Sequence, residues 1–343
     1  LKEYGRIVPS EVKDPQPGEG EVMVKVEYAS ICGSDQHIYK GEFHPRTPVP
    51  FIPGHEFAGY VLSAGKGVSG WEEGQKVTVD PIIPCGKCAA CKREHYPACT
   101  SLKLTGIDMD GGFAQYIAVP ASMLHALPPH VKPEHAALVE LLSIGFHASS
   151  RAGLRKDESA VIWGAGKVGQ AILHAAKTIT NGKIIMVDML SSRLEMARKA
   201  FPDIGIVNAT GADPYEKIRE MTGGVGADVA FEAVGHYHKI EGLFNPVRSC
   251  VQVIRGGGRV CVLGLGDEPV DILMKEMIWK EARIIASRVS HGEFRETINA
   301  LSDGRLNPDP MITSVMKLEE ADQAFHLLNE QPGNHLKILL RIP

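Results

Sequence analysis

The first part of the chain repeats apolar residues with the period of a β-strand. Valine recurs at every second position between residues 22 and 26, which predicts a half-buried strand leading directly to Cys32. Further β-rich segments are expected at 57–63, 76–80 and 113–119, separated by glycine-containing turns, and a helix is expected at 133–151. This part of the chain is therefore predicted to form a compact all-β domain.

After residue 159 the pattern changes to short apolar strands that alternate with helices. The expected strands are 160–163, 183–187, 204–208, 228–233, 259–265 and 283–287, and the expected helices are 170–179, 214–221 and 238–250. This alternation predicts an α/β fold with a doubly wound parallel sheet and right-handed crossovers. Helices at 293–302 and 319–331 and a strand at 336–342 then return the chain to the first domain. We therefore expect a discontinuous β-rich domain, 1–147 and 289–343, around a second domain, 148–288.

Composition excludes several classes of partner. At 343 residues the chain is long for one hydrophobic core, so two domains are expected. A net charge of -4 provides no basic surplus, which argues against nucleic acid and acidic membranes as partners. No apolar run reaches the 18 or more residues of a membrane helix. The sequence begins with Leu1 rather than Met, so residues can have been removed from its N-terminus, but we do not expect that a targeting peptide was among them.

Cysteine usage indicates a reducing compartment. Five of the seven cysteines lie in settings that resemble metal sites, which leaves only Cys250 and Cys261 spare. Unpaired cysteines in this proportion are typical of cytoplasmic proteins. A cytoplasmic location is therefore expected.

Two short motifs contain the groups of a catalytic metal site. Cys32, His55 and Glu56 offer a thiolate, an imidazole and a carboxylate, and three such ligands leave one tetrahedral position open. Each residue alone is more often an ordinary buried side chain. The motifs Cys-Gly-Ser-Asp-x-His and Pro-Gly-His-Glu-Phe-x-Gly are improbable together by chance, so we expect zinc here.

The residues after the first ligand suggest a proton path. Ser34 is two positions past Cys32, where its hydroxyl can accept the proton of an alcohol at the metal, and His37 can pass that proton outward. Asp35 can hydrogen-bond the far ring nitrogen of His55 and so fix its tautomer. Ser34 and His37 are therefore candidate catalytic residues.

A second group of cysteines predicts a structural metal. Four thiolates at this spacing close a tetrahedral shell with no open position: Cys85, Cys88, Cys91 and Cys99. Spacing alone also permits an iron–sulfur cluster, and zinc is the expected ion. A zinc ribbon that binds nucleic acid is the rival interpretation, which the acidic charge balance disfavours.

A glycine-rich turn predicts a dinucleotide site. The turn follows the strand 160–163, opens a helix and consists of Gly164, Ala165, Gly166, Lys167, Val168 and Gly169. Amides at the helix start can bind the pyrophosphate, and Asp188 at the end of the next strand can bind the ribose hydroxyls. Because Asp188 repels a 2′-phosphate, we expect a preference for NAD over NADP. Arg193 weakens this inference, since an arginine near the ribose can accommodate the 2′-phosphate of NADP. Further cofactor contacts are expected at carboxyl ends of strands: Val234, Leu263, Gly264, Leu265, Ser287 and Arg288.

The motifs, in this order over essentially the whole chain, resemble the zinc-dependent medium-chain alcohol dehydrogenases, in particular the sorbitol, butanediol and threonine dehydrogenase branch. The resemblance implies a GroES-like zinc catalytic domain, a Rossmann NAD-binding domain, two zinc ions per chain, and a homodimer or homotetramer. In that family an Asp followed five residues later by an Arg accompanies NAD, as in Asp188 and Arg193.

The resemblance also implies two further site residues. The segment from Glu140 to Ala148 is similar to the Glu-Pro-Leu-Ser-x-Gly-x-His-Ala segment of polyol dehydrogenases, whose Glu binds the catalytic zinc directly or through water. Leu141 replaces the Pro, and whether Glu56 or Glu140 contacts the metal stays open. In sorbitol dehydrogenases an Arg at the position of Arg288 faces the polyol, which makes Arg288 a candidate substrate contact.

The expected activity is hydride transfer between a secondary alcohol, a polyol or diol, and NAD. An L-threonine 3-dehydrogenase-like enzyme is the alternative, followed by a dinucleotide-binding homologue that has lost its chemistry. The expected partner is a small alcohol, with neither nucleic acid nor membrane involved.

Overall fold

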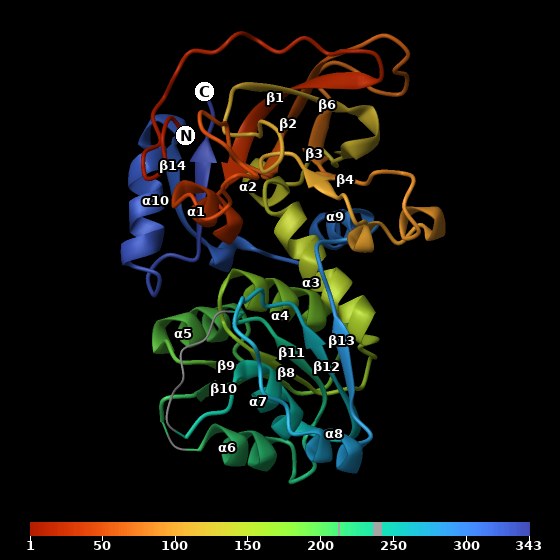
Figure 1. Cartoon of the computed structure of the whole chain (residues 1–343), viewed down its shortest axis with the longest axis vertical. Coiled ribbons are helices and arrows are strands. Elements are labelled where there is room, and N and C mark those ends of the chain that lie inside the picture. The colour runs from red at the N-terminus through yellow and green to blue at the C-terminus, as the bar shows by residue number, and fades with distance from the viewer. Residues whose placement is uncertain (212, 236–241) are drawn as a thin grey trace. The chain divides into compact units, whose positions relative to one another are not determined.

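The computed structural model describes residues 1–211, 213–235 and 242–343, which separate into two compact units (Figure 1). One unit comprises Leu1–Glu140 and Phe294–Pro343, and the other comprises Leu141–Glu293. The predicted domain boundaries lie inside helix α3 (Val139–Ala152) and just before helix α9 (Phe294–Ser302). Within the described residues, no helix combines the length and the apolar character needed to span a bilayer.

The first unit is built on strand β1 (Glu21–Ser30), whose alternating valines are fully buried. One side of β1 pairs antiparallel with β2, and its other side is shared between β6 and β15. The sheet runs β14-β15-β1-β2-β3-β7, while β4 and β5 form a separate pair. The strands are β2 (Glu56–Ala64), β3 (Lys76–Val79), β4 (Ile82–Ile83), β5 (Lys103–Leu104), β6 (Tyr116–Pro120), β7 (Leu124–Ala126), β14 (Ile312–Lys317) and β15 (Lys337–Arg341), and the remaining helices are α1 (Gly33–Tyr39), α2 (Pro133–Ala136) and α10 (Ala321–Glu330).

The second unit is the predicted doubly wound parallel sheet, with strand order β10-β9-β8-β11-β12-β13. Starting at β8, the chain adds β9 and β10 on one side of this strand. It then adds β11, β12 and β13 on the other side, so the strand order reverses between β8 and β11. The strands are β8 (Ala160–Trp163), β9 (Ile184–Asp188), β10 (Gly205–Asn208), β11 (Ala227–Glu232), β12 (Ile254–Val262) and β13 (Arg283–Ala286). The helices are α4 (Lys167–Ile179), α5 (Ser191–Ala200), α6 (Pro214–Met221), α7 (Pro246–Val253) and α8 (Met274–Lys280).

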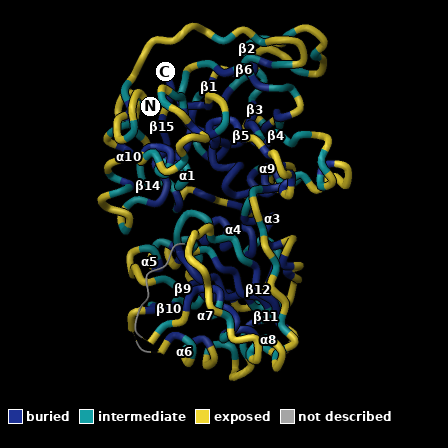
Figure 2. Tube along the Cα trace, in the orientation of Figure 1, coloured by how far each residue is buried: buried dark blue, intermediate teal, exposed yellow. Residues whose placement is uncertain are grey.

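Helices cover both faces of this sheet, which explains why its inner strands read as continuous apolar runs. Side chains of α3, α4 and α5 pack on one face, and side chains of α6 and α7 pack on the other. Figure 2 shows the inner strands buried and the connecting loops largely exposed. The α/β fold class is therefore confirmed.

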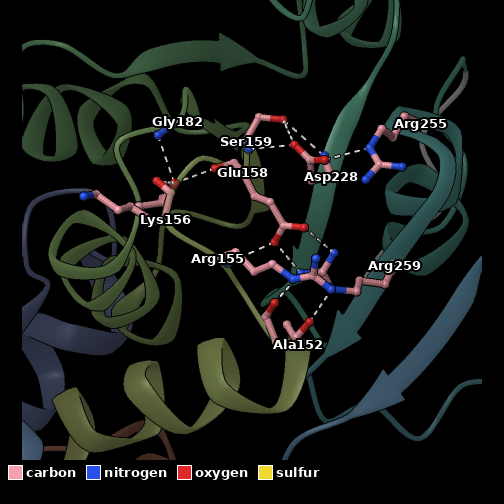
Figure 3. A network of polar contacts seen from close by, with 11 residues as sticks. Ala152, Arg155, Lys156, Glu158, Ser159, Gly182, Asp228, Arg255 and Arg259 are labelled. Carbon is pink, nitrogen blue, oxygen red and sulfur yellow. Dashed lines mark hydrogen bonds and ion pairs between the residues drawn. The ribbon is translucent and has the colours of Figure 1, made fainter.

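The amino edge of the parallel sheet is held by a network of ion pairs (Figure 3). Arg259 of β12 donates to both oxygens of Glu158 and to the carbonyls that end α3. Asp228 of β11 accepts from the amide and the hydroxyl of Ser159 and from Nε of Arg255. Charged groups at this edge therefore join α3, β8, β11 and β12.

Several predicted elements differ from the structure, and one of them is the strand expected at 259–265, which is β12 (Ile254–Val262). The strand expected from Phe113 begins only at Tyr116, because the amides of residues 111–113 bond to the carbonyls of residues 52–54, outside the sheet. The helix expected at 238–250 starts at Pro246, where Asn245 caps its first turn, and residues 236–241 lie outside the described residues. The helix expected at 133–151 is divided into α2 and α3.

Candidate metal centre and dinucleotide-binding edge

The pairing of β1 with β2 brings the three predicted zinc ligands together. Ser30 pairs with Glu56 across the two strands, and Cys32 follows two residues after the end of β1. The ligand atoms of Cys32, His55 and Glu56 all lie within 4.8 Å of one another. His55 is 4% exposed and Glu56 is fully buried, whereas Cys32 is half-buried, so the three donors converge at a point that is accessible from the side of Cys32.

Asp35 holds two of these ligands from behind. Its carboxylate accepts a hydrogen bond from the backbone N–H of Cys32 at 2.8 Å, and its other oxygen lies 3.5 Å from Nδ1 of His55. The opposite ring nitrogen, Nε2, lies 3.4 Å from Oγ of Ser34. Nε2 is therefore the nitrogen left for a metal, and Ser34 lies beside it.

The charges at this centre suit a cation. Burial lowers the pKa of His55, but the negative charges of Asp35 and Cys32 outweigh it and raise that pKa well above its ordinary value. A metal ion takes the place of a proton on the imidazole, so the same negative charges favour a bound cation. Oε1 of Glu56 is buried and has no hydrogen-bond partner among the described residues, as expected of an oxygen reserved for a cation. The donor set therefore fits zinc.

Lys337 is the residue of this centre that the sequence did not reveal. Its Nζ donates to Oε2 of Glu56 at 2.5 Å and to the carbonyl of Ile31 at 3.2 Å, and both charged side chains are fully buried. Burial raises the pKa of Glu56, but Lys337 and then His55 outweigh it, so that pKa lies below its ordinary value. The sequence feature that could have indicated Lys337 is a single lysine at the start of the apolar strand β15.

Glu140 lies near this centre but outside the group of converging ligand atoms. It is 4% exposed in the first turn of α3, and its Oε2 has no hydrogen-bond partner among the described residues. Burial raises its pKa to about 8. The charge of His55 lowers this pKa, and the negative charge of Glu56 raises it further. Glu140 is thus a buried acid beside the three ligands, and its role as a ligand stays a prediction.

The four cysteines of the lobe between β4 and β5 also converge. The Sγ atoms of Cys85, Cys88, Cys91 and Cys99 lie within 4.8 Å of one another, and all seven cysteines of the chain are free thiols. The backbone N–H groups of Cys91 and Thr100 lower the pKa of Cys88 to about 5, whereas burial raises the pKa of Cys91 to about 12. Four sulfurs in one shell match a closed structural zinc site.

The glycine turn lies at the carboxyl edge of the parallel sheet, between β8 and α4. A Cβ atom on Gly169 would lie 1.8 Å from the carbonyl oxygen of Gly164, so the turn cannot close with a larger residue there. Gly166 is the N-cap of α4, and the free amides of a helix start are suited to bind a phosphate, as the sequence predicts for this turn. Asp188 ends β9 and accepts from the amides of Ala165 and Leu190 at 2.6 and 2.8 Å. Asp188 is therefore fixed beside the turn, and its oxygens retain lone pairs for ribose hydroxyls.

The other predicted cofactor residues follow the strands of this edge. Val234 comes after β11, and Leu263, Gly264 and Leu265 come directly after β12. Ser287 follows β13, with its amide bonded to the carbonyl of Val262, and Arg288 comes next. Parallel strands present these positions at the edge where dinucleotides bind.

Comparison with known proteins identifies the family of the chain. The family model described as alcohol dehydrogenase GroES-like domain matches residues 18–129, and the model described as zinc-binding dehydrogenase matches residues 168–303. The L-threonine 3-dehydrogenase of Pyrococcus furiosus is 35% identical over 99% of this chain and 96% of its own. The sorbitol dehydrogenase of Halalkalibacterium halodurans is 30% identical over 98% of this chain and 96% of its own.

A solved structure shows the same architecture with a cofactor bound. The alcohol dehydrogenase RspB of E. coli CFT073, in complex with NADH, superimposes with a TM-score of 0.90 at 28% identity, over 99% of this chain and 97% of that one. The predicted fold and the predicted cofactors, zinc and NAD, are thereby confirmed. The chain belongs to the zinc-dependent medium-chain alcohol dehydrogenase family.

Proposed function

We propose that this oxidoreductase transfers hydride between a secondary alcohol of a polyol or diol and NAD. The observation that carries the proposal is the convergence of one thiolate, one imidazole and one carboxylate, those of Cys32, His55 and Glu56. Three protein ligands are the number that leaves a position for substrate on zinc. Intact ligands also argue against a homologue that has lost its chemistry.

The chain's own residues provide the proton path. When bound, zinc lowers the pKa of the alcohol hydroxyl and NAD accepts the hydride. Ser34, beside the metal-facing nitrogen of His55, accepts the hydroxyl proton, and His37 passes it toward solvent. Nδ1 of His37 lies against the carboxylate of Glu42, which orients the imidazole.

L-Threonine is the second candidate substrate. The observation in its favour is the identity of 35% with the threonine enzyme of Pyrococcus furiosus, against 30% with the sorbitol enzyme of Halalkalibacterium halodurans. L-Threonine and sorbitol each carry a secondary hydroxyl group, so the same zinc chemistry can oxidise either substrate. Arg288 at the carboxyl edge of the parallel sheet remains a proposed contact for the hydroxyl-rich substrate.

We further propose a homo-oligomer in the reducing cytoplasm. Strand β13 ends the order of the parallel sheet, and Ile284 on it is 40% exposed. Ile278 and Trp279 of the adjoining helix α8 are 70% and 74% exposed. An open strand edge beside exposed apolar side chains favours burial against another copy. The free cysteines support a reducing compartment.

Formation of NADH with a panel of substrates tests the proposed activity. Sorbitol, xylitol, butanediol, L-threonine and ethanol are each offered with NAD or NADP. The wild-type protein is expected to turn over with NAD and a polyol or diol. His55→Ala should lose this activity, whereas the control His130→Ala, which changes an exposed histidine, should retain it. Preference for L-threonine would select the second candidate, and no NADH with any alcohol would refute both.

A further inference from the structure

A single buried carboxylate joins the two loops that follow β11 and β12. Glu232, the last residue of β11, is 2% exposed. Its Oε1 accepts hydrogen bonds from the amides of Val234 and Gly235 at 2.8 and 3.0 Å. Its Oε2 accepts from the amide of Gly264 at 3.0 Å. The side chain therefore binds three backbone donors that belong to two different loops.

The two loops touch each other, with no room for a side chain between them. A Cβ atom on Gly264 would lie 2.2 Å from the amide nitrogen of Gly235 and 2.5 Å from Oε2 of Glu232. Gly235 has φ +75°, and a Cβ atom there would lie 2.6 Å from the carbonyl oxygen of Leu265. The conformation of each loop thus depends on the other, and Glu232 is the group bonded to both.

These loops lie where a dinucleotide binds in a doubly wound sheet. They follow adjacent parallel strands at the carboxyl edge, which is the ligand-binding edge of such sheets. Val234 is 40% exposed and Leu265 is 82% exposed, so both loops keep surface free for a ligand. Glu232 itself is buried beneath them and offers no surface to the ligand.

We propose that Glu232 is a positioning residue for NAD: its carboxylate fixes the loops 233–235 and 263–265 in the conformation that receives the cofactor. This inference rests on the proposed function, because it takes the carboxyl edge as the NAD site. Within the part of the chain that the structure describes, the hydrogen-bond partners of the Glu232 carboxylate are backbone amides.

Only a glutamate satisfies all three amides. A carboxylate has two acceptor oxygens, whereas Gln replaces one of them with an NH₂ group that faces an N–H donor. Glu232→Gln therefore loses at least one hydrogen bond and places two donors against each other. Glu232→Asp keeps the charge, but its side chain is one methylene shorter and cannot reach both loops equally. The two variants disturb the loops without altering any group at the surface.

Fluorescence titration of the zinc-loaded, full-length protein with NADH tests the inference. Glu232→Gln should weaken NADH binding by about tenfold, the usual effect of losing a hydrogen bond to a buried charge. The matched control is Asp228→Asn at the amino end of the same strand, where the carboxylate also binds a backbone amide. Both variants should unfold at lower temperature, but Asp228→Asn should bind NADH within about twofold of wild type.

The outcomes separate this inference from the proposed function. Wild-type protein that binds no NADH would refute the proposed function itself. If the wild type binds NADH, two results would overturn the role of Glu232 but leave the proposed function standing. Glu232→Gln could bind NADH as tightly as the wild type, or Asp228→Asn could weaken NADH binding as much as Glu232→Gln does. If Glu232→Gln does not fold, Glu232→Asp decides: a raised KM for NAD with kcat retained at saturating NAD supports positioning, and an unchanged KM overturns it.

Discussion

Lys337→Met is predicted to destabilise the unit formed by residues 1–140 and 294–343, because it removes the cation that neutralises Glu56. Both side chains are fully buried, and their charged atoms lie 2.5 Å apart. Methionine fills nearly the same space but donates to neither Glu56 nor the carbonyl of Ile31. The variant therefore leaves a carboxylate buried beside the metal site without its lysine.

The size of the effect follows from this burial. Breaking a buried ion pair by removing one partner typically costs about 3–5 kcal/mol. For a domain of this size each kcal/mol lowers Tm by roughly 2–4 °C. The first unit of Lys337→Met should therefore unfold roughly 6–20 °C below the wild-type protein.

The difference should depend on pH in a defined direction. In the wild type, Lys337 holds the pKa of Glu56 below its ordinary 4.5, so this contribution to stability is present above pH 4.5 and is lost as pH falls through the lowered pKa. In the variant, burial outweighs His55, the pKa of Glu56 rises, and stability is lost as pH rises instead. The gap in Tm should be widest near neutral pH and narrow toward pH 4.5.

Calorimetry of protein stripped of only its labile zinc measures both effects. Lys25→Met, an exposed lysine on β1, is the matched control and should change the free energy of unfolding by less than about 0.5 kcal/mol. The double variant Glu56→Gln, Lys337→Met should regain part of the loss, because no unpaired charge remains buried. A Tm for Lys337→Met equal to that of Lys25→Met at neutral pH would refute the reasoning.

Three further predictions concern separate parts of the chain. Asp188→Ala should weaken NAD binding and relax the preference against NADP with unchanged zinc content, which titration with both dinucleotides measures; a wild type that prefers NADP contradicts the assignment. Ser34→Ala should keep zinc and NAD but lose turnover by roughly two to four orders of magnitude in steady-state kinetics, and near-normal turnover means that the proton leaves by another route. Because Arg259 outweighs burial and lowers the pKa of Glu158, this ion pair stabilises the protein above pH 4.5 and is lost as pH falls. The Tm of Glu158→Gln should therefore fall less steeply than that of the wild type in acid, and parallel slopes in calorimetry would contradict the role of this pair.

Residues brought together by local rules were accessible from the sequence. Gly164 to Gly169 follow a strand and open a helix, and this short-range context is all that a phosphate-binding turn requires. Cys32 and His55 lie at facing ends of two paired strands, so their motifs already indicated one site. The doubly wound sheet followed from the alternation of strands with helices.

Residues whose partners are set by distant pairing were not accessible. Lys337 contacts Glu56 only because β15 pairs with β1, and 281 positions separate the two residues in the chain. Glu232 reads as the end of an apolar strand, since its function as an acceptor depends on how two loops fold over it. The start of β6 differs from the prediction because the amide of Phe113 bonds to the carbonyl of Pro53, a partner 60 positions away in the chain.

Zinc content and NADH formation, followed together during stepwise chelation, test the central claim most directly. The open site of Cys32, His55 and Glu56 should lose its ion before the closed four-cysteine site, because solvent and chelator reach an open coordination position. The account predicts two zinc ions per chain in freshly purified protein, with activity falling to zero as the first is removed and returning when zinc is restored. Active protein that holds one zinc ion or none, or activity that survives loss of the first ion, would contradict it.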